Sequence, residues 1–179
     1  MKLGERGYTL IEVLISITIM ALASSAAGGA IFQIMRNTER NADHMTVARQ
    51  VQNAGDWISR DAQMSLGVSA TANLTLPAFL VLRWTENVSS TQPIYHTANY
   101  TIENLSCGIG TLKRRHTSSA GANEQTLIAQ YIYYNPADTA NTSNANYQSP
   151  ILILKVTASV GGILETREYK ISRRPNTSG

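Results

Sequence analysis

Hydrophobic residues are concentrated in one long run near the start of the chain, from Leu10 to Phe32, and Glu12 is the only charged residue within it. A helix of this length is sufficient to cross a hydrocarbon core about 30 Å thick. Lys2 and Arg6 precede the run, which favours a cytoplasmic location for that end of the helix. The pattern therefore predicts a single transmembrane helix over residues 8–34, with its N-terminus cytoplasmic.

Helical periodicity continues beyond this run. Apolar residues recur at spacings of three or four, which trace one face of a helix: Val47, Val51, Ala54, Ile58 and Ala62. Charged residues occupy the other positions, so the spacing predicts an amphipathic continuation over residues 35–67. Gly67, directly after Leu66, is the expected stop signal.

The pattern changes to short β-rich stretches after Asn73. The strands expected on this basis lie at 79–84, 94–102, 126–134, 151–160 and 163–172. Gly161-Gly162 separates the last two stretches and fits a two-residue hairpin turn with positive φ angles. Alternate residues of the first hairpin strand are apolar and are expected to face the helix: Leu152, Leu154, Val156, Ala158 and Val160.

These elements predict an α+β fold, in which a long N-terminal helix packs on a C-terminal antiparallel β-sheet. The globular β domain is expected over residues 68–179. Residues 138–148 are rich in Asn, Ser, Thr and Ala, which is typical of a surface loop within that domain.

Glu12 is the unusual residue of the apolar run. A carboxylate deep in a membrane costs a few kcal/mol when it is unpaired, so it marks a functional hypothesis. A secretory signal cleaved within the small residues 23–27 would leave Glu12 unexplained. A simple membrane anchor gives no reason for it either.

The sequence Gly7-Tyr8-Thr9-Leu10-Ile11-Glu12 resembles the class III signal of type IV pilins and pseudopilins. The resemblance implies that prepilin peptidase removes a leader, residues 1–7, by cutting between Gly7 and Tyr8, and then N-methylates Tyr8. The family usually has phenylalanine where this chain has Tyr8, a conservative departure. A helix followed by an antiparallel sheet is also similar to the pilin fold over the whole chain. The closing hairpin and residues 105–115 are similar to J-type minor pseudopilins and related minor pilins.

This resemblance also implies partners. Glu12 would pair with the amine that cleavage creates at Tyr8, either within one helix or in a neighbouring subunit, because a buried charge is tolerated when it is paired. Residues 8–34 would lie first in membrane lipid and later in a filament core, together with other pilins or pseudopilins and an inner-membrane assembly platform. The domain after residue 68 would be periplasmic or extracellular. We expect a minor subunit of a type IV pilus or a type II secretion pseudopilus.

The remaining chemistry predicts no enzyme, cofactor or metal site. Cys107 is the single cysteine, so the chain can form neither an internal disulfide nor a cysteine-based zinc site. His44, His96 and His116 are scattered, and each is expected to be exposed or capped. The net charge of +3 gives no general argument for nucleic acid.

Lys113, Arg114, Arg115 and His116 form the densest basic run. It could contact DNA if the protein were instead a filament-tip binding module for DNA uptake (competence) or adhesion. The favoured interpretation is a solvated strand end or turn, because nearby aromatic residues cannot be placed beside the run. Asp56 and Asp61 are expected in salt bridges or in solvent.

Overall fold

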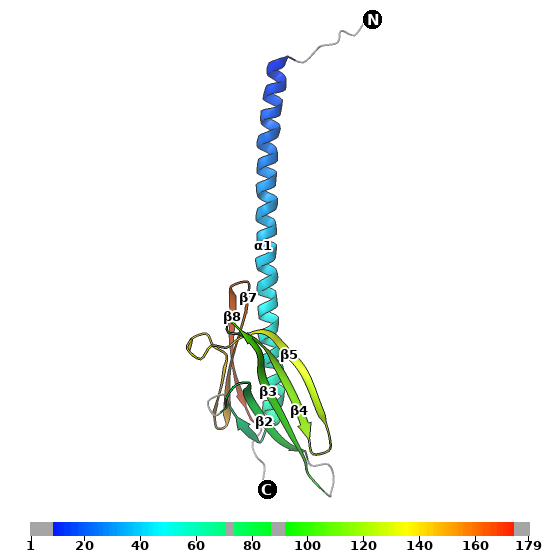
Figure 1. Cartoon of the computed structure of the whole chain (residues 1–179), viewed down its shortest axis with the longest axis vertical. Coiled ribbons are helices and arrows are strands. Elements are labelled where there is room, and N and C mark those ends of the chain that lie inside the picture. Colours follow the sequence, from blue (N-terminus) through cyan, green and yellow to red (C-terminus); the bar gives the residue numbers. More distant parts are fainter. Residues whose placement is uncertain (1–8, 71–73, 87–91, 174–179) are drawn as a thin grey trace. The chain divides into compact units, whose positions relative to one another are not determined.

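The computed structural model describes residues 9–70, 74–86 and 92–173. It divides into two compact units, the N-terminal unit Met1–Ala42 and the C-terminal unit Asp43–Gly179. One helix, α1 (Leu10–Met64), contributes residues to both units (Figure 1). The predicted long helix is confirmed from Leu10 onward, whereas Tyr8, where it was expected to begin, lies outside the described residues.

The helix is exposed to its surroundings throughout the N-terminal unit. Each residue from Leu10 to Ala42 is exposed, and Leu10 and Met20 are the most exposed of the large apolar side chains in this stretch. By length and composition, α1 can cross a membrane. This part of the chain therefore contributes nothing to the buried core of the protein.

Helix α1 ends earlier than the sequence predicted. Its last residue is Met64, and the Ser65 amide and hydroxyl both donate to the carbonyl oxygen of Ala62. The Leu66 amide then donates to the carbonyl of Arg83, so the chain is already pairing with the sheet. Gly67 is therefore the first residue of a strand and not the helix stop that we expected.

The C-terminal unit contains an eight-stranded antiparallel sheet. Its path order is β1-β2-β3-β4-β5-β7-β6, and β8 pairs with β7. The strands are β1 (Gly67–Ser69), β2 (Ala78–Glu86), β3 (Ile94–Ser106), β4 (Ile109–Ser118), β5 (Asn123–Tyr133), β6 (Asn144–Gln148), β7 (Ile151–Val160) and β8 (Ile163–Ser172). The fold is thus α+β and pilin-like, as the sequence predicted.

The sheet is nearly divided between β5 and β7. A single residue pair, Ile132 with Ala158, joins these two strands. Beyond this pair, side chains of α1 form hydrogen bonds with the backbone of β5. Asn53 Nδ2 donates to the carbonyl of Ile128, and Gln50 Oε1 accepts from the amide of Gln130. Figure 1 shows the C-terminal part of α1 beside these strands.

The core lies between this part of α1 and the sheet. The predicted helix face is confirmed, because its five members are fully buried: Val47, Val51, Ala54, Ile58 and Ala62. From the sheet, Tyr100, Phe79 and Leu154 are among the largest side chains that pack in the same cluster. All of these residues belong to the C-terminal unit.

The closing hairpin agrees with the prediction to the residue. β7 and β8 pair along their whole length, and both Gly161 and Gly162 have positive φ angles, 58° and 80°. Glycine adopts this conformation without the steric cost that other residues meet. Of the alternating residues, the first four are buried and the last is partly buried: Leu152, Leu154, Val156, Ala158 and Val160.

Three strands were missed and one predicted loop is wrong in part. The short β1 begins at Gly67, where the sequence predicted only the helix stop. β6 lies within 138–148 and pairs with β7, with Ala145 buried and Tyr147 packed on the core. β6 lies at the edge of the sheet, where a strand needs few apolar residues. Its Asn-rich composition therefore did not indicate a strand. β4 includes the whole basic run, so that run is neither a strand end nor a turn.

Candidate functional site

The first turn of α1 contains a reciprocal capping arrangement between Thr9 and Glu12. Glu12 Oε2 accepts hydrogen bonds from the Thr9 amide and from the Thr9 hydroxyl, each at 3.0 Å. The Glu12 amide in turn donates to Thr9 Oγ1 at 3.4 Å. A threonine followed three residues later by glutamate is the capping-box pattern, which satisfies amides that a helix start leaves unpaired.

This arrangement adds a residue that sequence reasoning missed. The Thr-x-x-Glu spacing was visible in the sequence, but the expected partner of Glu12 was the amine of processed Tyr8. Gly7 and Tyr8 lie outside the described residues. In the described part of the unprocessed chain, Thr9 is the partner of the Glu12 carboxylate.

The structure does not bring the three cations of the basic run together. Because side chains alternate along a strand, Lys113 and Arg115 lie on the face opposite to Arg114. Lys113 pairs with Glu103 at 2.6 Å, and Arg115 Nε donates to Asn123 at 3.0 Å. The arrangement does not form a joint cationic surface for nucleic acid.

Arg114 instead lies in the core, where it binds Asp61 of α1. Arg114 Nε and Nη2 donate to the two carboxylate oxygens at 2.6 and 3.1 Å, and the Tyr100 hydroxyl donates to Oδ2 at 2.7 Å. Arg114 is 8% exposed, Asp61 3% and Tyr100 0%. The sequence allowed a salt bridge for Asp61 but gave no sign that it would be buried.

Burial and charge act together on this trio. Burial raises the pKa of Tyr100 well above its usual range, and the charge and hydrogen bond of Asp61 act in the same direction. Burial alone would lower the pKa of Arg114, but the hydrogen bond and charge of Asp61 outweigh it and raise that pKa. The trio therefore holds a neutral phenol and a charged pair, with the Arg114 guanidinium 5.4 Å from the Trp57 ring centroid.

The expectation that all three histidines are exposed or capped is wrong for two of them. His44 is exposed on α1. His96 and His116 are partly shielded, and His96 Nδ1 lies 3.1 Å from His116 Nε2. They meet because β3 and β4 are neighbours and both side chains lie beside Trp84.

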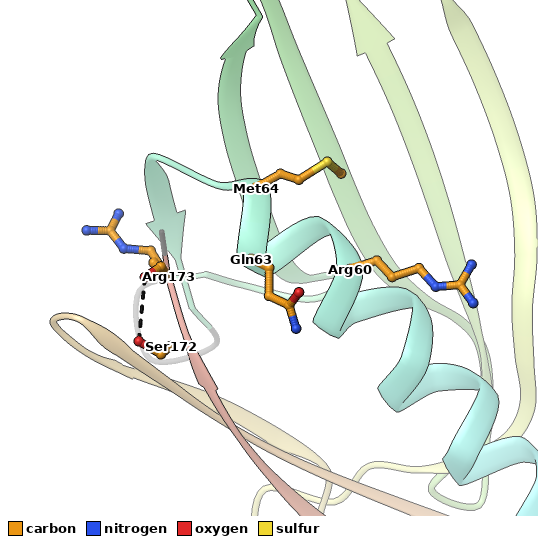
Figure 2. Close-up of a pocket in the computed structure, with 5 residues that line it drawn as sticks. All are labelled: Arg60, Gln63, Met64, Ser172 and Arg173. Atoms are coloured by element: carbon orange, nitrogen blue, oxygen red, sulfur yellow. Dashed lines mark hydrogen bonds between the residues drawn. The ribbon is translucent and has the colours of Figure 1, made fainter. Parts of the chain in front are cut away.

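A cavity of about 630 Å³ lies at the C-terminal end of α1 and is lined by Arg60, Gln63, Met64, Ser172 and Arg173. Figure 2 shows that the side chains of Arg60 and Arg173 point in opposite directions. The Arg173 guanidinium contacts the Leu66 carbonyl and lies 5.0 Å from the Tyr147 ring centroid. The cavity therefore lacks the converging donors of an anion site.

Residues 9–70, 74–86 and 92–173 give little support for a metal site or for cysteine chemistry. These residues contain no group of three or more His, Cys, Asp or Glu side chains placed to hold a metal ion. Cys107 is exposed in the turn between β3 and β4. The N-terminal segment is thus the best-defined functional feature of the chain.

Comparison with known proteins points to the same segment. Residues 2–28 match the family model described as the prokaryotic N-terminal methylation motif. This match supports a protein of the type IV pilin or pseudopilin type, and such a motif implies processing by prepilin peptidase and assembly with other pilins. No curated protein and no solved structure matches the chain.

Proposed function

We propose that this protein is a minor pilin or pseudopilin, a structural subunit of a type IV pilus or a type II secretion pseudopilus. The observation that carries the proposal is the methylation motif over residues 2–28, at the start of an exposed apolar helix. In this proposal the subunit has no catalytic activity and acts by packing in a filament. A large globular unit without a disulfide-closed loop supports a minor subunit, and the closing hairpin is in keeping with the J-type subfamily.

Glu12 would select the register of assembly. Prepilin peptidase would cut between Gly7 and Tyr8 and create a positive amine one helical turn from the Glu12 carboxylate. In a staggered filament the carboxylate could exchange Thr9 for the amine of a neighbouring subunit. A subunit out of register would leave both charges in an apolar environment, which costs free energy.

Membrane storage before assembly follows from the same features. Residues 8–34 would span the inner membrane, with the leader cytoplasmic and the C-terminal unit periplasmic. An inner-membrane assembly platform would then move the subunit into the filament. The apolar side chains of α1 would exchange lipid for other pilin helices.

Processing is tested by coexpressing the full chain with a prepilin peptidase and measuring its intact mass. We expect loss of the first seven residues and one added methyl group on Tyr8. A Gly7→Leu variant, which places a bulky side chain at the cut, should stay uncut. An uncut wild-type chain, or cleavage near Ala27, would contradict the proposal.

Assembly is tested with a Glu12→Ala variant. We expect normal cleavage but strongly reduced incorporation into filaments, measured by immunoblotting of the sheared filament fraction. Glu39→Ala removes another exposed carboxylate of α1, outside the apolar run, and should incorporate normally. Equal incorporation of both variants would refute the register role of Glu12.

A further inference from the structure

Three aromatic rings from neighbouring strands lie parallel at one end of the sheet. Trp84 of β2, His96 of β3 and His116 of β4 have ring planes within 7° of each other. The Trp84 centroid lies 5.2 Å from that of His96 and 5.6 Å from that of His116. The indole therefore lies beside both imidazoles.

The two imidazoles meet through a hydrogen bond between ring nitrogens. His96 Nδ1 and His116 Nε2 are 3.1 Å apart, and the ring centroids are 5.3 Å apart. An N–H···N bond needs one proton between these two nitrogens, so one ring donates and the other accepts. When both rings carry a second proton, neither nitrogen can accept and two positive charges face each other.

The charged groups around the pair come from every neighbouring element. Glu86 of β2 lies 3.3 Å from His96 Nε2, but that nitrogen has no hydrogen-bond partner among the described residues. Arg114 lies two residues from His116 on β4, Glu124 is opposite His116 on β5, and Asp61 approaches from α1. Glu86 is mostly exposed and Asp61 is already paired with Arg114, so neither fully offsets a second charge.

We propose that His96 and His116 form an acid-sensitive latch that joins β3 to β4 beside Trp84. The latch is closed when the pair shares one proton and opens when both rings become charged. The latch lies within the C-terminal unit and does not depend on filament assembly.

The direction of the pH effect follows from the surroundings of His116. Burial lowers its pKa, and the charges of Arg114 and His96 lower it further, whereas Asp61 and Glu124 act in the opposite sense. The folded state therefore binds this proton less readily than the unfolded state. Stability is fully present above the ordinary histidine pKa and falls as the pH drops from there to the lower pKa of the folded protein.

The first test is an NMR titration of the imidazole Cε1–H signals in the full chain in detergent micelles. His96 and His116 should titrate in two linked steps that belong to the pair. Two independent single steps would overturn the proposal, and this measurement needs no variant beyond those used for assignment.

The second test compares His96→Gln, His116→Gln and the matched control His44→Gln. In either latch variant the remaining histidine should titrate in one step. Opening of the latch beside Trp84 should change the tryptophan fluorescence of the wild-type chain on acidification, and this change should be lost in both variants. His44→Gln should behave as wild type. If the remaining histidine and the fluorescence both keep their wild-type pH profiles, the latch does not exist.

Discussion

Arg114 shows how one buried charge can connect a helix to a sheet. Removing a guanidinium and a carboxylate from water costs several kcal/mol per ion, and only good geometry and further hydrogen bonds offset this cost. Here Arg114 makes two bonds to Asp61, and the Tyr100 hydroxyl supplies a third to the same carboxylate. Loss of one partner would leave the other charge buried without its counter-ion.

An Arg114→Ala variant should therefore be destabilised by about 3–5 kcal/mol. The measurement is urea unfolding of the full chain in detergent micelles. Lys113→Ala is the matched control, because it removes the neighbouring but more exposed pair with Glu103 and should cost at most about 1 kcal/mol. Equal losses for the two variants would show that burial of Arg114 does not matter.

Thr9 should control how firmly the first turn of α1 is formed. A Thr9→Val variant removes the hydroxyl that exchanges hydrogen bonds with Glu12, at a cost of about 1 kcal/mol. We expect roughly 5-fold faster amide hydrogen exchange in that turn. Thr18→Val, which removes only a bond to the Leu14 carbonyl, should leave the first turn unchanged. Unchanged exchange in Thr9→Val would contradict the capping role.

At the scale of elements, Gly55 explains how β8 approaches the helix. A Cβ atom at this position would overlap the ring of Tyr169, whose hydroxyl donates to the carbonyl of Val51. Glycine lowers the stability of a helix interior by about 1 kcal/mol relative to alanine. The close contact with the Tyr169 ring is what makes glycine necessary here.

A Gly55→Ala variant should therefore be destabilised by about 1–3 kcal/mol, despite its better helix propensity. In a Tyr169→Ala background the same change should become neutral or stabilising. Urea unfolding of the four proteins in this cycle measures the coupling between the two residues. A Gly55→Ala protein that is stabilised while Tyr169 is still present would contradict the packing argument.

The predictability of the elements depended on how local their signals are. The β7–β8 hairpin was predicted to the residue because Gly161-Gly162 and the flanking alternation are both local signals. The buried face of α1 was predicted because its apolar spacing is regular. β4 was missed because its basic run conceals that Arg114 has a partner on α1, 53 residues away in the sequence.

The same limit applies to the candidate site. The sequence predicts Gly7, Tyr8 and Glu12 as site residues because the motif is short and continuous, and these roles stay predictions. It did not identify the pairing of His96 with His116, which depends on the register of β3 and β4. Contacts of this kind can be predicted only when the register of the paired strands is known.

At the scale of the whole molecule, the two units differ in what they contribute to the buried core. The buried hydrophobic residues begin at Val47, so the described N-terminal residues supply none of the core. A chain that lacks residues 1–35 should remain folded and become soluble without detergent. Its urea midpoint should match that of the C-terminal unit in the full chain, and loss of a cooperative transition would contradict this expectation.

The buried pair of Asp61 and Arg114 also has a mechanical consequence. A pull along α1 reaches the C-terminal unit as a shearing force between the helix and the sheet. A slip of one residue moves a helix by about 1.5 Å and turns it by about 100°, which would swing Asp61 away from Arg114. Trp57, four positions before Asp61 on nearly the same helix face, carries no charge, and α1 ends at Met64, before the position four residues after Asp61. The pair of Asp61 and Arg114 therefore resists sliding of α1 along the sheet in either direction.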